Sequence, residues 1–231
     1  MLMYLVFMVP ALLFSLYAQW QVSSTYKKYS QVRSARGLSG TDVAQVLMRN
    51  EGLTHVGVER IDGMLTDHYD PSAKVIRLST GSQAPSVAAM AIVAHELGHA
   101  AQDKQGYVWL QVRSGIVGIA NVGSQLGMVL FFVGLLLASF AGSGLGVSIA
   151  WAGVILMSAA VVFTLVTLPV EFNASARARD MLMRNGLVTT EEAAGVNAVL
   201  NAAAMTYVAA AAQAVSQLLY WILMLVGMRR D

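Results

Sequence analysis

Long apolar stretches alternate with polar regions along this chain. The apolar stretches cover residues 1–22, 114–140, 147–168 and 205–228. A helix needs about 20 mainly apolar residues to cross a bilayer, so the pattern predicts a multi-pass membrane protein with up to four spans. The fourth stretch is rich in alanine and carries Gln213, Ser216 and Gln217, which favours either a span or a helix packed within the bundle.

The ends of these stretches show how they connect. Residues 1–22 lack the basic start and the small-residue cleavage site of a signal peptide, so we expect a retained anchor. Residues 141–146 are glycine-rich and uncharged, which predicts a tight hairpin between the second and third spans. The third span is expected to break at Leu168 and Pro169, because proline disrupts a helix interior.

The two polar regions, residues 23–113 and 169–204, predict a small α+β part of zincin-like type beside a mainly α-helical membrane domain. Spacing, caps and β-branched residues indicate its elements. They are a helix over residues 41–51 capped by Thr41, strands over residues 54–60 and 74–79, a helix over residues 86–105, and a helix opened by the capping-box pair Thr189 and Glu192.

Composition and charge place the polar regions on one side of a membrane. The chain is 56% hydrophobic and 12% charged, against about 25% charged in an ordinary soluble domain. Ten of its 15 Lys and Arg residues lie between the first two spans, which predicts a cytoplasmic location for the polar regions. Arg229 and Arg230 are the dissenting charges. A net charge of +2 without a basic cluster excludes nucleic acid as a partner.

The helix over residues 86–105 carries the run His95-Glu96-Leu97-Gly98-His99. Residues four apart share one helix face, so His95 and His99 can offer two imidazoles to one Zn²⁺. Glu96 is then the predicted catalytic base, and Gly98 is a small residue that permits close packing. With no cysteine in the chain, every ligand must be nitrogen or oxygen.

A catalytic zinc site needs a third protein ligand. Neither His55 nor His68 sits in a third-ligand pattern, whereas Glu171 follows the third span, and the predicted hairpin returns it to the membrane face of His99. A carboxylate at the base of a membrane helix is costly without a partner. Glu171 is therefore the predicted third ligand.

Several further stretches carry a resemblance to a known family. They are Asp67-His68-Tyr69-Asp70-Pro71, Ala91 to Ala100, Asn121-Val122-Gly123-Ser124, Leu168 to Ser175, and Leu200 to Tyr207. Over nearly its whole length the chain resembles the YugP-type membrane zinc metallopeptidases, relatives of the HtpX and CAAX-prenyl-protease group. The resemblance implies a gluzincin-like site with Glu171 as ligand, and a bacterial plasma-membrane enzyme of protein quality control. One departure is Ser175, where HtpX enzymes usually have an aspartate that would orient a ligating histidine. Ser175, Asn173 or Asp180 could replace it.

Secondary candidates concern substrate and oxyanion binding. The strand Val75-Ile76-Arg77-Leu78 precedes the histidine helix, so it is a candidate edge to which a peptide substrate adds, with simple coverage of the helix as the alternative. Tyr207, Asn201, Arg177 and Arg179 are candidate donors to an oxyanion; arginines beside a membrane are also common anchors.

These observations predict a zinc-dependent membrane endopeptidase that acts on membrane or membrane-proximal polypeptides. Two alternatives stay open: a non-catalytic zinc-binding membrane scaffold, and a site-2-type intramembrane protease. The intact Glu96 disfavours the scaffold, because binding alone would not need that carboxylate. The polar residues that closely follow His99 disfavour the intramembrane protease. The sequence leaves the substrate, any membrane partner protein and the oligomeric state open.

Overall fold

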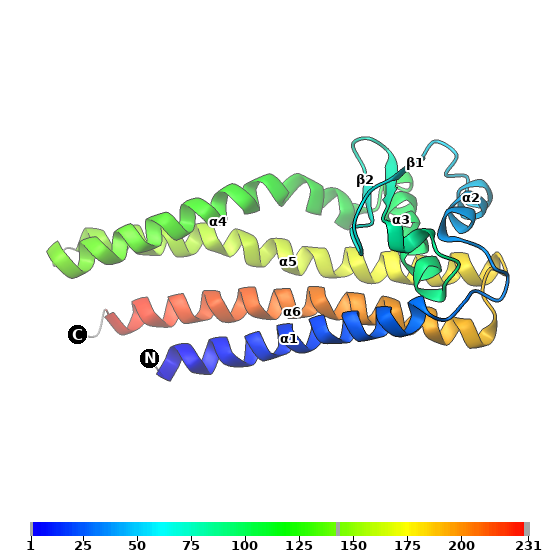
Figure 1. The fold of residues 1–231 in the computed structure, drawn as a ribbon. Coiled ribbons are helices and arrows are strands. Elements are labelled where there is room, and N and C mark those ends of the chain that lie inside the picture. Colours follow the sequence, from blue (N-terminus) through cyan, green and yellow to red (C-terminus); the bar gives the residue numbers. More distant parts are fainter. Residues whose placement is uncertain (1, 142–143, 229–231) are drawn as a thin grey trace. The chain divides into compact units, whose positions relative to one another are not determined.

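The computed structural model describes residues 2–141 and 144–228 (Figure 1). The described chain is mainly helical with one small sheet, which confirms the coarse fold class. Its helices are α1 (Leu2–Ser30), α2 (Gly40–Asn50), α3 (Val87–Lys104), α4 (Val108–Ala141), α5 (Gly144–Arg184) and α6 (Thr190–Met228). Part of the predicted turn at residues 141–146 and the dissenting charges Arg229 and Arg230 lie outside the described residues.

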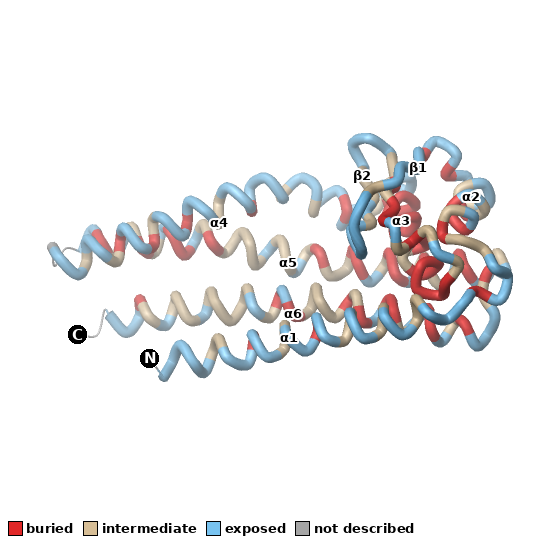
Figure 2. Tube along the Cα trace, in the orientation of Figure 1, coloured by how far each residue is buried: buried red, intermediate tan, exposed pale blue. Residues whose placement is uncertain are grey.

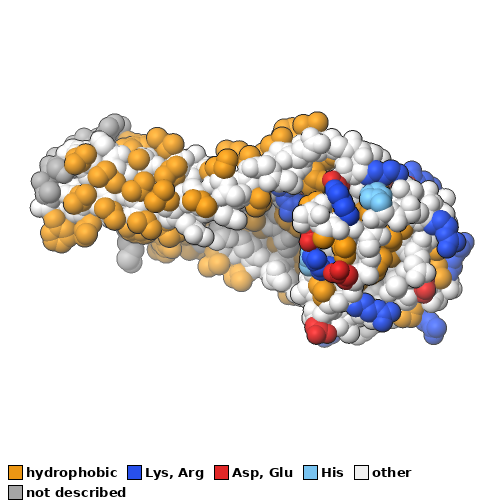
Figure 3. All heavy atoms as spheres, turned by 90° about the horizontal axis from the view of Figure 1, so that it is seen from above, with side chains coloured by type: hydrophobic (Ala, Val, Ile, Leu, Met, Phe, Trp, Pro, Cys, Tyr) orange, Lys and Arg blue, Asp and Glu red, His pale blue; other side chains and the backbone are white. Residues whose placement is uncertain are grey.

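The chain divides into two compact units. Unit 1 consists of the described residues up to Tyr17, Val112–Leu168, and the described residues from Tyr207 onward. Unit 2 consists of Ala18–Gln111 and Pro169–Thr206. The helices α1, α4, α5 and α6 are each long and apolar enough to cross a membrane by length and composition. Apolar side chains cover the surface of unit 1 in the space-filling view, as expected of a surface facing lipid (Figure 3).

Within unit 1, glycines bring α4 and α5 into close backbone contact. A Cβ atom at Gly134 would lie 2.3 Å from the backbone nitrogen of Ala150, and one at Gly153 would lie 2.5 Å from that of Phe131. Only glycine allows this approach, because any Cβ atom would collide with the facing backbone. Such close packing matters in lipid, where helices gain no hydrophobic driving force for association. The predicted pairing of the second and third spans therefore has a specific packing basis.

The predicted break at Pro169 is wrong, since α5 continues from Gly144 to Arg184 with Pro169 inside it. Proline in a helix interior removes one hydrogen bond and crowds the preceding turn, at a cost of about 3 kcal/mol. Long apolar helices tolerate this when neighbouring groups satisfy the freed backbone. The segment that carries Glu171 is consequently a direct helical continuation of the third apolar stretch.

The core of unit 2 surrounds α3, which is buried along most of its length (Figure 2). Val43 and Leu47 of α2 and Met181 and Leu182 of α5 belong to the same buried cluster. Burial on several sides explains why the apolar residues of α3 are not confined to one face. The core holds the histidine helix in a fixed position.

The caps of these helices are partly as predicted. The capping box of α6 is present, with Thr189 N–H donating to Glu192 and Glu192 N–H donating to the Thr189 hydroxyl. The cap of α2 is Ser39 and not Thr41, because Ser39 forms a reciprocal capping box with Asp42. Gly106, with φ +62°, follows the end of α3 as expected.

A three-stranded sheet lies next to α3 in unit 2. Its strands are β1 (Gly57–Arg60), β2 (His68–Asp70) and β3 (Val75–Leu78), in the order β1-β3-β2. β1 runs parallel to β3, and β2 runs antiparallel to it. The sequence predicted β1 and β3 but missed β2, whose three residues are too few to show a strand pattern.

Candidate metal centre

The helix α3 presents His95 and His99 side by side. Their ring centroids are 4.8 Å apart and their planes are inclined by 83°. The side chain of His95 is 13% exposed and that of His99 is 10% exposed. Two largely buried imidazoles are poorly solvated, so their ring nitrogens need partners within the protein or a bound metal.

The partner comes from α5. The Oε2 atom of Glu171 lies 3.2 Å from His95 Nε2 and 3.5 Å from His99 Nε2, and the Glu171 side chain is 2% exposed. Ligand atoms of these three residues all lie within 4.8 Å of one another. Among the described residues, they form the one group of three or more His, Asp or Glu side chains that could hold a metal ion. The structure thus brings together the three residues predicted to hold zinc.

The spacing of these atoms suits zinc. Zinc binds imidazole nitrogen and carboxylate oxygen at about 2.0–2.2 Å in tetrahedral geometry, which places ligand atoms roughly 3.3 Å apart. The separations of 3.2 and 3.5 Å around Glu171 Oε2 are close to this value. Three protein ligands also leave a fourth position open, which is typical of catalytic sites.

Close packing of α3 on α5 makes the cluster possible. A Cβ atom at Gly98 would lie 2.5 Å from the carbonyl oxygen of Ala174, so a larger residue would push the two helices apart. Gly98 lies between the two histidines, and Ala174 lies one turn after Glu171. The predicted role of Gly98 as a small residue near the metal therefore has a direct geometric counterpart.

Gln102 holds His99 and was missed in the sequence. Its Nε2 atom donates to Val170 O (2.8 Å) and Asn173 Oδ1 (3.0 Å), while its Oε1 atom lies 3.1 Å from His99 Nδ1. The backbone oxygen of Val170 can only accept, which fixes the orientation of the Gln102 amide. His99 must then carry its proton on Nδ1, and its Nε2 atom is free for a metal. Gln102 lies three residues after His99 and is fully buried, but its sequence neighbours resemble an ordinary helix end.

Ser175 takes the corresponding place beside His95. Its hydroxyl lies 3.3 Å from His95 Nδ1, while His95 Nε2 faces Glu171. Of the other residues considered for this role, Asn173 contacts Gln102 and Asp180 lines a separate pocket. Each histidine therefore has a polar partner on the ring nitrogen that faces away from Glu171.

Glu96 faces the sheet. Its Oε2 atom accepts a hydrogen bond of 2.9 Å from the backbone N–H of Tyr69 in β2, and Glu96 is 8% exposed. The Tyr69 hydroxyl donates to Asp103 one turn beyond the histidines, and Lys74 forms an ion pair with the same carboxylate. Tyr69 thus joins β2 to α3 at two points.

The predicted substrate strand requires a correction. Val75-Ile76-Arg77-Leu78 forms β3, which is the central strand and has β1 and β2 hydrogen-bonded on its two sides. A peptide cannot add to a strand whose two edges are occupied. The strand whose outer edge faces Glu96 is β2.

Electrostatics follow from these contacts. Burial alone would lower the pKa of His99, but the hydrogen bond and the charge of Glu171 outweigh burial and raise that pKa. Hydrogen bonds from Ser72, Ala73 and Arg77 hold the pKa of Asp70 well below its usual range. Tyr69 has a raised pKa because of burial and its bond to Asp103, so it stays a neutral donor.

The remaining candidates are not part of the three-residue metal-ligating group. Arg177 donates to Asn173 and Gln105 and lines a pocket that does not include the three metal-ligating residues. Asn201 accepts from Arg179. Tyr207 belongs to unit 1, whereas the cluster lies in unit 2. The role of these residues at an oxyanion stays a prediction.

Comparison with known proteins gives two matches in agreement. A family profile described as "Putative neutral zinc metallopeptidase" matches residues 4–226. The protein named "Putative membrane protease YugP" from Bacillus subtilis (strain 168) is 41% identical over 224 residues, which cover 96% of each chain. No solved structure matches.

Proposed function

The chain belongs to this family of zinc metallopeptidases, with zinc as its cofactor, and we propose that it is a membrane endopeptidase. In this proposal His95, His99 and Glu171 hold the zinc ion, and Glu96 is the general base. The observation that carries it is the largely buried cluster of two imidazoles and one carboxylate, with Glu96 on the helix of the two histidines.

The chemistry divides between the metal and the chain. Zinc, when bound, supplies a Lewis acid that polarises the scissile carbonyl and lowers the pKa of water. Glu96 accepts the proton of the attacking water and delivers it to the leaving amine. The Tyr69 N–H binds one oxygen of the Glu96 carboxylate and so orients the other for this transfer. Gln102 and Ser175 hold the two imidazoles in the required orientation.

We further propose that a polypeptide substrate pairs with the outer edge of β2. The strand β2 is at an edge of the sheet. Its Tyr69 N–H is already bound to Glu96, so in this proposal the peptide pairs with the other outward backbone groups of the edge. A peptide added along this edge runs beside the proposed base. Backbone pairing binds an extended chain with little regard to its side chains, which suits degradation of varied membrane-proximal segments.

The proposed site faces the cytoplasm, because most basic residues lie in unit 2 segments that flank the apolar helices. The chain contains no cysteine, so single introduced cysteines report topology without background. A cysteine at Arg60 should be labelled from the cytoplasm and one at Leu145 from the opposite side. Reversed labelling would reject this orientation and the cytoplasmic pool of substrates.

The decisive experiment measures zinc content and cleavage of a casein-like unfolded substrate in purified full-length protein. Glu96→Gln should retain zinc and lose several orders of magnitude in rate, because it removes a base and not a ligand. Glu171→Ala should lose both zinc and activity, since two imidazoles remain. Full zinc binding without cleavage by the wild type would instead identify a metal-binding scaffold. The proposal prefers a membrane-proximal site to the intramembrane alternative, because the histidine helix α3 is not among the described helices long and apolar enough to span a membrane.

A further inference from the structure

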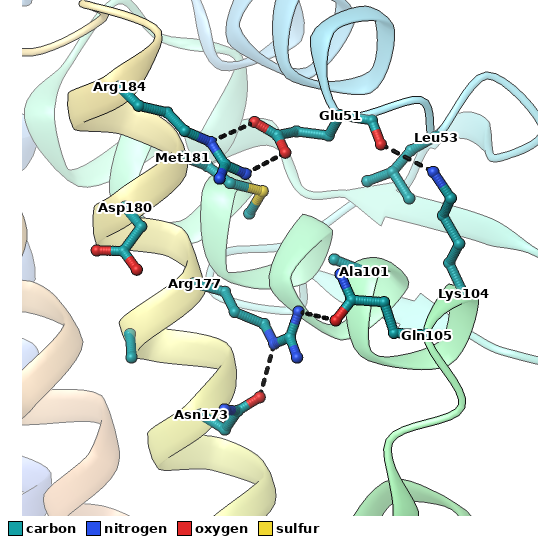
Figure 4. Close-up of a pocket in the computed structure, with 11 residues that line it drawn as sticks. Glu51, Leu53, Ala101, Lys104, Gln105, Asn173, Arg177, Asp180, Met181 and Arg184 are labelled. Atoms are coloured by element: carbon teal, nitrogen blue, oxygen red, sulfur yellow. Dashed lines mark hydrogen bonds and ion pairs between the residues drawn. The ribbon is translucent and has the colours of Figure 1, made fainter.

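A pocket in unit 2 lies between α3, α5 and the end of α2. Its volume is about 300 Å³, at the lower limit of ordinary small-molecule sites. The side chains that line it include none of His95, His99 and Glu171. Polar residues dominate its wall, as the close-up shows (Figure 4). The family assignment does not explain this pocket.

The charges in this pocket are unevenly paired. Glu51 receives two hydrogen bonds from Arg184 and one from Asn185, so its charge is neutralised. Arg177 and Lys104 have no such carboxylate partner within ion-pair distance in the part of the chain that the structure describes. Two cations with neutral partners make an anion-binding wall.

The two cations are held in place before any ligand arrives. Arg177 donates through Nε to Asn173 Oδ1 and through Nη1 to Gln105 Oε1, each at 2.7 Å, and its guanidinium lies 5.9 Å from the ring centre of Tyr107. Lys104 donates to two backbone oxygens at the end of α2, each at 3.0 Å. A ligand therefore does not have to order these long side chains, which is a usual cost of binding.

The remaining charged residue, Asp180, defines the ligand further. Asp180 is exposed, lines the same pocket and has no ion pair among the described contacts. Its negative charge reduces the positive potential, which disfavours a dianion. We propose that the pocket binds a singly charged carboxylate on Arg177, with Lys104 adding positive charge from another part of the same wall. The carboxylate belongs either to a free small acid or to the C-terminus of a peptide.

Calorimetric titration of the full-length, zinc-loaded protein in detergent tests the proposal. N-acetylglycinate should bind saturably, whereas N-acetylglycinamide, which has the same shape without the charge, should not. Arg177→Gln and Lys104→Gln should each weaken binding by about tenfold or more, as expected for loss of a charged hydrogen bond. Arg60→Gln is the matched control, because Arg60 is exposed in β1 and outside the pocket.

A variant that binds more tightly shows that the losses in the other variants are not caused by unfolding. Asp180→Asn should tighten N-acetylglycinate binding several-fold, because it removes the neighbouring negative charge. Lys104 is exposed, so Lys104→Gln provides a loss-of-binding variant with an intact fold even if Arg177→Gln does not fold. Carboxylate binding that persists undiminished in Lys104→Gln and Arg177→Gln would place the ligand elsewhere, for instance on zinc, and overturn the proposal. Tighter binding of phosphate than of carboxylate would overturn it as well.

Binding to the Glu96→Gln variant, which should not cleave peptides, distinguishes a free small acid from a peptide C-terminus as the ligand. If pentaglycine with a free C-terminus binds more tightly than N-acetylglycinate, the pocket is a site for peptide C-termini. Weaker binding of pentaglycine assigns it to a free small acid. Both measurements concern binding, so they stand whether or not the chain cleaves peptides.

Discussion

Replacing Gln102 by leucine tests how the chain prepares His99 for metal. The variant removes three hydrogen bonds of 2.8, 3.0 and 3.1 Å and leaves the Nδ1–H of His99 buried without an acceptor. An unsatisfied buried donor costs about 1–3 kcal/mol, and loss of such a partner of a ligating histidine typically weakens metal binding about 10–100-fold. We therefore expect both the thermal midpoint and zinc affinity to fall.

Zinc affinity is measured by competition with a chromophoric chelator, and stability by thermal unfolding of the metal-free chain. Gln105→Leu is the matched control, because Gln105 is an exposed glutamine near the end of the same helix that contacts Arg177 and no proposed ligand. Gln102→Glu should keep zinc affinity within a few-fold, since its carboxylate still accepts from His99, but lose stability because it faces the oxygens of Val170 and Asn173. Wild-type zinc affinity in Gln102→Leu would refute the reasoning.

Three further predictions follow from packing, charge and metal linkage. Gly98→Ala should destabilise the fold by about 1–3 kcal/mol and weaken zinc binding, because its Cβ would lie 2.5 Å from Ala174 O; Gly115→Ala, with no atom within 4 Å, should do neither. Burial works to raise the pKa of Asp103, but its bonds to Lys74 and Tyr69 lower it below 3.8, so its stabilisation is present above that pH and lost in acid. The difference in thermal midpoint between wild type and Asp103→Asn should accordingly shrink from pH 7 to pH 3. Zinc at 100 times its Kd should stabilise the fold by about 2.7 kcal/mol, and a midpoint unchanged by chelation would contradict the proposed site.

Features that depend on local interactions could be predicted from the sequence. His95 and His99 share a helix face because they are four residues apart, and the cap at Thr189 depends on a partner three residues away. Apolar stretches of sufficient length likewise predicted four helices able to span a membrane. In each case the interacting groups lie within a few residues, or the property is a sum over one segment.

Features that depend on packing between distant segments were decided by the tertiary structure. Glu171 was predicted as a ligand, but its approach to His95, 76 residues away, depends on the close contact of Gly98 with Ala174. The role of Gln102 in orienting His99 was not predictable, because Val170 contacts Gln102 only when α5 packs on α3. From the sequence, the edge strand was placed at β3, because the three residues of β2 are too few to show a strand pattern. The pairing of β1 and β2 with β3 makes β3 central and leaves β2 at the edge. Hydrogen-bond partners across α3, α5 and β2 are selected by burial and shape, and neither is encoded in the spacing of any single segment.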